Sequence, residues 1–342
     1  MAKKSSVLLI YTGGTIGMKQ DAKTGSLVPF NFEHIKKQVP ELEKFDIELS
    51  SISFQPPMDS SNMAPETWVK LAKIIEENYN KYDGFVILHG SDTMAFTASA
   101  LSFMFEDLNK PIILTGSQLP IGMIRTDGKE NLITAIEIAA AKENNKPVVP
   151  EVAIYFEYQL YRGNRTHKFN SEHFDAFQSP NYPILAEAGV SIKYNYVRIQ
   201  KPSAKKMKVS YAFDTDITIL KIFPGINKHA VDAVLNTKNL KAVVLETFGS
   251  GNAPSSDWFL KSVKTAIDKG IIVYNISQCN AGSVKQGTYD TSKGLAKIGV
   301  ISGKDSTTET AVAKLMYLLG KKLPRKQTEK LLGESLRGEL TA

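Results

Sequence analysis

Short apolar runs rich in β-branched and aromatic residues alternate with longer segments whose apolar residues recur at helical spacing. The runs predict strands at Val7–Ile10, Phe45–Phe54, Phe85–Leu88, Pro111–Gly116 and Val149–Phe156. The segments between them predict helices at Pro65–Lys81, Thr93–Leu108 and Gly128–Asn144. Such alternation predicts a mostly parallel sheet with helices on both faces.

Predicted strands and helices alternate again in the C-terminal part of the chain, after an interruption. Residues 191–215 show weak periodicity, and we interpret them as the connection between two domains. Beyond them we predict strands at Ile217–Phe223, Ala242–Thr247 and Ile271–Ile276, and helices at His229–Asn236, Ser256–Lys269, Thr307–Leu319 and Thr328–Leu336. The predicted fold class is α/β with two domains. A larger N-terminal domain, residues 1–190, has a mostly parallel sheet flanked by helices, and a smaller C-terminal α/β domain spans residues 216–342.

Composition and charge exclude several classes of function. The chain of 342 residues is 42% hydrophobic and 23% charged, as in ordinary soluble proteins, and carries a net charge of +7. Its densest basic clusters, Lys205–Lys208 and Lys321–Lys326, lie in no nucleic-acid-binding motif, so we expect no nucleic-acid partner. No apolar run is long enough to span a membrane, and no signal peptide precedes the first strand. We therefore expect a cytoplasmic protein without a membrane partner.

The residues that usually bind metals are too few and too scattered. Cys279 is the single cysteine, so an internal disulfide is excluded. The five histidines show no spacing typical of a zinc site, and we expect no metal.

Two polar motifs follow predicted strands. Thr12-Gly-Gly-Thr15 follows the first strand, and Gly90-Ser-Asp92-Thr93 follows Phe85–Leu88. In open α/β sheets, ligands bind at the carboxyl ends of the strands, and a hydroxyl becomes a nucleophile where a neighbour takes its proton. The alternatives stay open, because the first motif also fits an ordinary turn and the second a helix start capped by Ser91 or Asp92.

Two more segments carry polar groups that could join the same site. Asp59-Ser60-Ser61 fits either a common turn or a donor loop for a carboxylate. Tyr161–Lys168 is polar and charged, which is usual for a solvated loop, but it contains a lysine after a buried strand. A lysine acts as a base only where burial favours its neutral form, and a nearby Asp92 would oppose that. The sequence leaves the protonation state of Lys168 open.

In order along the chain, these four segments resemble bacterial L-asparaginases, and most of all the cytoplasmic type I branch. The motifs that match are Thr12–Gly17 (TGGTIG), Met58–Ser61 (MDSS), His89–Met94 (HGSDTM) and Arg162–Lys168 (RGNRTHK). The likeness extends over nearly the whole chain, at Tyr82–Leu88, Thr115–Gln118, Gly249–Pro254, Asn275–Cys279 and Leu336–Thr341. Each motif alone is weak, but the ordered set is specific.

The resemblance implies hydrolysis of L-asparagine to L-aspartate and ammonia, a reaction that needs no cofactor. Thr15 would be the nucleophile or would lie against the side-chain amide. Thr93, Asp92 and Lys168 would form the polar triad that handles the proton of the attacking hydroxyl or water.

The resemblance also implies a set of substrate-binding residues. Ser60 and Ser61 would bind the α-carboxylate beside Asp59, Asp92 would also bind the α-ammonium, and Ser117 would lie where the pocket closes. A further residue, Asn252, resembles one that a neighbouring subunit contributes. A homodimer or homotetramer with sites near the subunit interfaces is therefore expected.

Two departures from the family pattern stand out. Relatives usually place a tyrosine in the segment after TGGT, but Gly25–Pro29 contains none, and no tyrosine occurs between Tyr11 and Tyr79. The activation of the threonine, or its lid, must differ in detail. Some type I relatives have a regulatory asparagine site with an arginine where this chain has Glu246, and the reversed charge weakens the case for carrying that regulation over.

Two other functions fit the same motifs. An amidotransferase component would release ammonia for another active site, but such relatives carry an additional domain before TGGT, which begins here at residue 12. An amino-acid sensor without catalysis is also compatible, because a fold does not fix a function. Release of ammonia from asparagine distinguishes an enzyme from a sensor.

Overall fold

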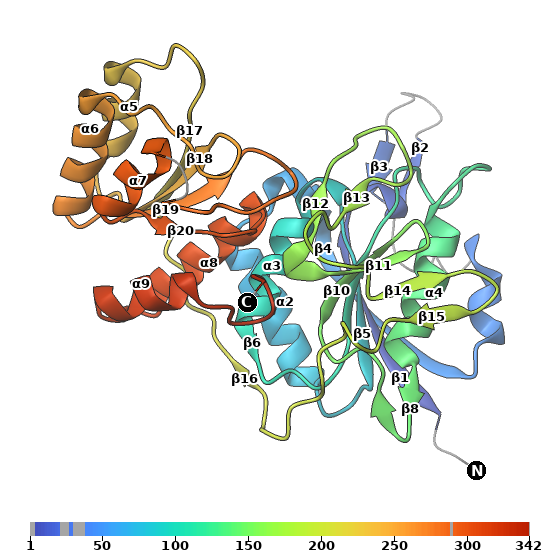
Figure 1. The fold of residues 1–342 in the computed structure, drawn as a ribbon. Helices are drawn as coiled ribbons and strands as arrows, with labels where there is room; N and C mark the ends of the chain where they lie inside the picture. Colours follow the sequence, from blue (N-terminus) through green and yellow to red (C-terminus); the bar gives the residue numbers. More distant parts are fainter. Residues whose placement is uncertain (1–3, 21–26, 30–37, 288–289, 342) are drawn as a thin grey trace. The chain divides into compact units, whose positions relative to one another are not determined.

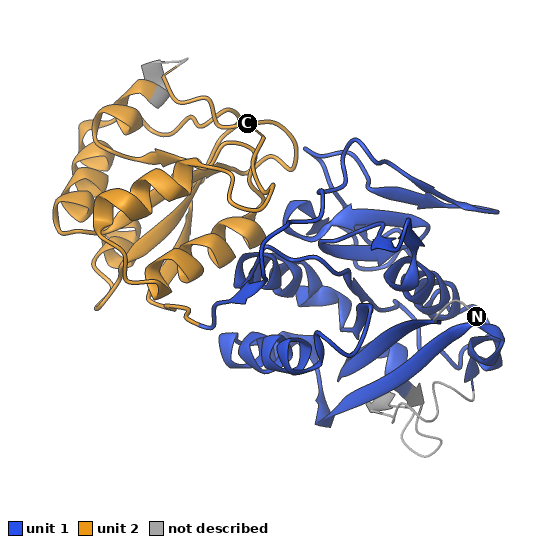
Figure 2. Ribbon diagram, turned by 90° about the horizontal axis from the view of Figure 1, so that it is seen from below, with its two compact units in different colours: residues 1–211 blue, residues 212–342 orange. Residues whose placement is uncertain are grey.

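The computed structural model describes residues 4–20, 27–29, 38–287 and 290–341. The chain divides into two compact units, Met1–Tyr211 and Ala212–Ala342 (Figure 2). The boundary lies inside the segment 191–215 that we interpreted as a connection, and residues up to Tyr211 pack with the first unit. Among them, β15 (Ile192–Tyr194) joins the large sheet, and β16 (Lys208–Val209) pairs with β6 (Phe105–Glu106).

The first unit is built on an eight-stranded sheet with the order β15-β14-β11-β10-β7-β5-β1-β4 (Figure 1). Its parallel part confirms the predicted strands and consists of β1 (Ser5–Gly13), β4 (Ile47–Met58), β5 (Gly84–Leu88), β7 (Ile112–Thr115) and β10 (Val152–Phe156). Its antiparallel part was not predicted and consists of β11 (Gln159–Arg162), β14 (Ala186–Ala188) and β15. The sheet is thus mostly parallel, as expected.

The antiparallel part begins at a two-residue turn that lacks the residues typical of such turns. Glu157 and Tyr158 join β10 to β11, and both have positive φ, 44° and 64°. Two-residue hairpin turns of this kind usually contain asparagine, aspartate or glycine. Since neither residue is a turn former, the local pattern gave no sign of the hairpin.

Helices cover both faces of this sheet, with α4 on one face and α2 and α3 on the other (Figure 1). They are α2 (Pro65–Asn78), α3 (Met94–Met104) and α4 (Gly128–Ala140). The apolar face of α4 packs against alternate residues of β1 and β5, among them Val7 and Val86. All three helices end three or four residues earlier than predicted. For α3 and α4 the reason is that Phe105 enters β6 and that β8 (Lys142–Glu143) and β9 (Lys146–Pro147) form a hairpin.

The second unit contains a four-stranded parallel sheet in sequential order. Its strands are β17 (Ile217–Lys221), β18 (Ala242–Thr247), β19 (Ile272–Ser277) and β20 (Ile301–Ser302). Its helices are α5 (Lys228–Leu235), α6 (Asp257–Asp268), α7 (Asp290–Lys297), α8 (Thr308–Gly320) and α9 (Arg325–Gly333). The predicted strands and helices are confirmed within a few residues, whereas α7 and β20 were not predicted.

The loops that follow β1, β4 and β5 pack backbone against backbone at the carboxyl end of the large sheet. Gly14 has a φ of 86°, and a Cβ atom there would lie 2.5 Å from the backbone nitrogen of Gly90. A Cβ atom on Gly13 would lie 2.0 Å from the carbonyl oxygen of Met58, and one on Gly90 would lie 2.5 Å from Ser60 Oγ. Glycine is therefore required for the contact between these loops, and not only for the turn.

A buried histidine at the end of β5 supports the third of these loops. His89 Nδ1 lies 2.7 Å from the carbonyl oxygen of Gly90, and Nε2 lies 2.9 Å from Thr97 Oγ1. A carbonyl oxygen only accepts hydrogen bonds, so Nδ1 carries the proton and Nε2 accepts from Thr97. Trp68 Nε1 donates to the same hydroxyl at 3.1 Å. Burial lowers the pKa of His89 to about 4, so the ring is neutral at pH 7.

We expect His89 to make stability depend on pH between about 6.5 and 4. Its pKa is depressed in the folded state, so the unfolded chain binds the proton first as the pH falls, and stability is lost toward pH 4. The difference in pKa corresponds to about 3 kcal/mol. Urea unfolding at several pH values should show this loss in the wild type and in the exposed control His229→Gln, and a smaller loss in His89→Gln. Equal pH dependence in all three proteins would contradict the assignment.

Gly14→Ala should destabilise the first unit by roughly 2–4 kcal/mol, because alanine is strained at positive φ and its methyl group meets the Gly90 backbone. Gly122→Ala is the matched control, since a Cβ atom there meets nothing closer than 3.7 Å. The free energy of unfolding, measured with urea, should change little in the control. Similar losses of unfolding free energy in both variants would show that the close packing of the loops makes no specific contribution to stability.

Candidate active site

Polar segments follow three neighbouring parallel strands, β4, β1 and β5, and meet at the carboxyl edge of the sheet. Thr15 begins the short 3-10 helix η1 (Thr15–Gly17), and Ser60 begins η3 (Ser60–Asn62). The third segment forms η4 (Ser91–Thr93) before α3. The sheet order alone places these loops side by side, which is where open α/β sheets bind ligands.

Lys168 reaches this edge from the short hairpin of β12 (His167–Lys168) and β13 (Phe177–Gln178). Its Nζ lies 2.6 Å from Asp92 Oδ1 and 2.8 Å from Ser91 Oγ. The Lys168 side chain is 14% exposed, whereas that of Asp92 is 68% exposed. The structure therefore brings together the predicted lysine and aspartate, with the aspartate open to solvent.

The suggestion that Ser91 or Asp92 caps a helix is wrong. Neither η4 nor α3 has a hydrogen bond from a side-chain cap. The Ser91 hydroxyl and the Asp92 carboxylate bind Lys168 instead. Ser91 is thus a site residue that the sequence reasoning missed, although it lies inside the motif that was singled out.

Thr93 links this cluster to the loop after β4, because its hydroxyl donates to the carbonyl oxygen of Ser60 at 2.7 Å. In that loop, Asp59 Oδ1 accepts from both the backbone nitrogen and the hydroxyl of Ser61, each at 2.8 Å. These hydrogen bonds, with the backbone one contributing most, lower the pKa of Asp59. Asp59 is therefore a charged group that fixes Ser61. Ser60 is buried and Ser61 is exposed.

Thr15 lies next to Gly14, which packs against Gly90, so its loop contacts the segment that carries Asp92 and Thr93. Its side chain is partly exposed. Within the described part of the chain no residue makes a hydrogen bond with the Thr15 hydroxyl, which leaves it free to meet a ligand. The nearby Thr12 hydroxyl donates to the carbonyl oxygen of Leu88 at 2.9 Å and ties the ends of β1 and β5 together.

A fourth loop, after β7, joins the cluster through Gln118. Ser91 Oγ donates to Gln118 Oε1 at 3.2 Å. Asp127 accepts from the backbone nitrogens of Gln118 and Leu119 at 2.9 and 3.1 Å, and burial nevertheless raises its pKa. Ser117, the predicted residue of this loop, is buried and donates to the carbonyl oxygen of Leu119. Its hydroxyl thus stabilises the loop itself.

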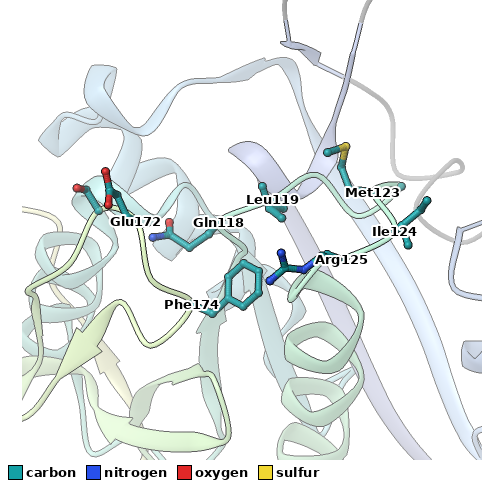
Figure 3. Close-up of a pocket in the computed structure, with 9 residues that line it drawn as sticks. Gln118, Leu119, Met123, Ile124, Arg125, Glu172 and Phe174 are labelled. Carbon is teal, nitrogen blue, oxygen red and sulfur yellow. The ribbon is translucent and has the colours of Figure 1, made fainter.

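Gln118 also lines a pocket of about 670 Å³ beside the cluster (Figure 3). The other residues that line it are Leu119, Gly122, Met123, Ile124, Arg125, Ser171, Glu172 and Phe174. The pocket is therefore an open depression between the loop after β7 and the loop that joins β12 to β13. Sequence reasoning missed both Gln118 and this pocket.

The remaining predicted residues belong to the second unit or lie partly outside the described residues. Asn252 belongs to the second unit, where its backbone forms an isolated bridge with Phe248. Glu246 is buried in the same unit and accepts from Thr308 Oγ1 at 2.7 Å, and the Cys279 thiol is exposed. The segment Gly25–Pro29 is only partly described, because residues 25 and 26 lie outside the described residues.

Among the residues that the structure describes, no cluster of three or more histidine, cysteine, aspartate or glutamate side chains could hold a metal ion. No helix there is long and apolar enough to cross a membrane.

Comparisons with known proteins agree along the whole chain. Residues 6–200 match the family model "Asparaginase, N-terminal", and residues 216–332 match "Glutaminase/Asparaginase C-terminal domain". L-asparaginase 1 of Escherichia coli strain K12 is 43% identical over 351 residues, which cover 99% of each chain.

Solved structures give the same result. L-asparaginase I from Vibrio cholerae O1 biovar eltor is similar with a TM-score of 0.89 and 41% identity, over 99% of this chain and 100% of that one. The probable cytoplasmic L-asparaginase from Campylobacter jejuni is similar with a TM-score of 0.77 and 26% identity, over 97% and 100%. The resemblance inferred from the four motifs is thereby confirmed, and the chain belongs to the asparaginase family.

Proposed function

We propose that the protein is an L-asparaginase, which hydrolyses the side-chain amide of L-asparagine to L-aspartate and ammonia. The observation that carries the proposal is the cluster of Lys168, Asp92 and Thr93 at the carboxyl edge of the sheet, with the loop of Thr15 packed against the same segment. These segments supply two alcohols, a carboxylate and an amine, which are groups that acyl transfer uses. Membership of the family and the names of the relatives support the same reaction.

Thr15 is the nucleophile in this proposal. Its oxygen attacks the amide carbon, the C–N bond breaks, and the hydroxyl proton leaves with ammonia. Water then attacks the resulting ester, releases aspartate and restores the threonine hydroxyl. The free hydroxyl of Thr15 favours this choice over Thr93, whose proton is directed at the carbonyl oxygen of Ser60. Backbone N–H groups of the glycine-rich turns would bind the developing oxyanion.

Thr93, Asp92 and Lys168 would relay the proton of the Thr15 hydroxyl to the leaving nitrogen, which departs as ammonia. The hydroxyl of Thr93 donates to Ser60 and keeps its lone pairs available as acceptors. Lys168 is held by Asp92 and Ser91. Its ammonium group would lie close to the reacting amide, where negative charge develops on the oxyanion. No step requires a metal or an organic cofactor.

Substrate binding follows from the charges of the neighbouring loops. The α-ammonium group of asparagine would lie against the exposed carboxylate of Asp92. Ser60 and Ser61 would bind the α-carboxylate, with Asp59 fixing Ser61, and the loop of Ser117 would close the pocket.

Lys168→Met should abolish ammonia release and leave the binding of aspartate nearly intact, because the longer part of the side chain is retained and only the charged group is lost. Thr15→Ala and Thr93→Val should be inactive as well. A coupled assay for ammonia and calorimetry with aspartate would measure the two properties. Lys264→Met is the matched control, since Lys264 forms an exposed ion pair with Asp268 in the second unit. Full turnover by Lys168→Met would remove this lysine from the mechanism, and a wild type that binds aspartate but releases no ammonia would indicate a sensor.

The proposal includes a homodimer or homotetramer in the cytoplasm, with Asn252 contributed to the site of a neighbouring subunit. The Campylobacter jejuni relative, a probable cytoplasmic L-asparaginase, supports the location. Asn252→Ala should lower kcat/KM about tenfold or more, on the scale of a lost hydrogen bond to a charged ligand, without changing the mass that sedimentation measures. A monomer with full activity would disprove this part.

A further inference from the structure

We propose that Gln118 is a positioning residue, which acts through Ser91 to hold Lys168 in place and anchors the β12–β13 hairpin to the same cluster. The inference rests on the proposed function, since Lys168 is the group that it positions. Its basis is a continuous chain of hydrogen bonds. Lys168 Nζ lies 2.8 Å from Ser91 Oγ, Ser91 Oγ lies 3.2 Å from Gln118 Oε1, and Gln118 Nε2 lies 3.0 Å from the carbonyl oxygen of His173.

The chemistry of these groups gives the chain a single direction. The carbonyl oxygen of His173 only accepts, so it fixes the NH₂ group of Gln118 on its side and leaves Oε1 facing Ser91. Since Oε1 also only accepts, the Ser91 proton points to Gln118. The lone pairs of Ser91 then face Lys168, which donates to them from its ammonium group. Gln118 therefore fixes the direction of the Ser91 O–H bond, and with it the direction of the lone pairs that accept from Lys168.

Without Gln118 the hydroxyl of Ser91 would be free to rotate. Lys168 would then keep only Asp92 as a fixed partner, and that carboxylate is 68% exposed. Interactions at such exposed groups are weakened by water and by side-chain motion. A catalytic lysine that moves by about an ångström loses a large part of its effect on the rate.

The second contact of Gln118 fixes the hairpin that carries Lys168. Asn170 Oδ1 accepts from the backbone nitrogens of Glu172 and His173, at 2.8 and 3.0 Å, so the loop that presents the His173 carbonyl is itself folded. Phe169 N donates to the carbonyl oxygen of Ala176 at 2.9 Å and closes the base of that loop. In Figure 3 the Gln118 amide points away from Arg125, toward the end of the pocket occupied by Glu172. Gln118 thus bridges Ser91 and the hairpin loop from one position.

The test compares kcat and KM for asparagine in Gln118→Met, Ser91→Ala and the double variant. Gln118→Met keeps the length of the side chain and removes both polar contacts, so kcat should fall about tenfold to a hundredfold while KM stays within about threefold. The part of the loss that passes through Ser91 should vanish in the Ser91→Ala background, so Gln118→Met should lower kcat by a smaller factor there than in the wild type. Losses in kcat that multiply fully in the double variant would overturn the proposal.

Gln118→Glu separates the two contacts. It keeps an acceptor for Ser91 and loses the donor to His173, so it should recover at least about tenfold of the kcat lost in Gln118→Met. A kcat as low as that of Gln118→Met would overturn the role through Ser91. Should Gln118→Met fail to fold, as judged by its melting curve, the same cycle is run with Gln118→Ala, which also removes both polar contacts. Gln327→Met, on the exposed face of α9, controls for the substitution itself.

The outcomes also separate this inference from the proposed function. A wild type that releases no ammonia from asparagine contradicts the proposed function. An active wild type with unaltered kcat in Gln118→Met contradicts only the role of Gln118.

Discussion

The close contact between the backbones of three loops is the constraint on which the site depends. Gly13 and Gly14 bring the end of β1 against Met58 and Gly90, at separations that leave no room for a Cβ atom. Because the contact is made by backbone atoms, it cannot adjust as side chains do when a neighbour changes. The positions of Thr15, of Ser60 and of the segment from Ser91 to Thr93 are therefore set together.

The electrostatic state of the cluster follows from the same packing. His89 is buried directly behind it, and burial keeps its ring neutral at pH 7. Its two hydrogen bonds, to Gly90 and Thr97, hold the loop without adding a charge beside Asp92 and Lys168. A protonated histidine at this position would add a second positive charge to the loop that carries Asp92. The fold thus supports the loop with a group that leaves the Lys168–Asp92 ion pair undisturbed.

The sequence predicted those features that depend on local pattern. Both sheets and most helices follow from apolar runs and periodicity, and the loops of Thr15 and Asp92 followed from their place after buried strands. The position of Lys168 after a buried strand made it a candidate for the same site, but only the resemblance to a family implied that it meets Asp92, 76 residues away in the chain. The edge formed by β11, β14 and β15 was missed because Glu157 and Tyr158 adopt positive φ without the usual turn residues. Gln118 was missed because the role of a lone glutamine depends on the direction of two hydrogen bonds that only the folded chain defines.

The unequal exposure of the central ion pair suggests how one carboxylate can serve two cations. Lys168 is mostly covered and takes Oδ1 of Asp92, while the aspartate remains open to solvent. In the described part of the chain no group donates to Oδ2 of Asp92. In the proposed function, the α-ammonium group of the substrate would bind Oδ2 without displacing Lys168, and its partner would already be oriented. The Asp92 carboxylate is then already fixed in the folded protein. Binding therefore loses less side-chain entropy, which is the advantage of a preorganised site. This arrangement allows Asp92 to belong both to the group that handles the proton and to the group that recognises the substrate.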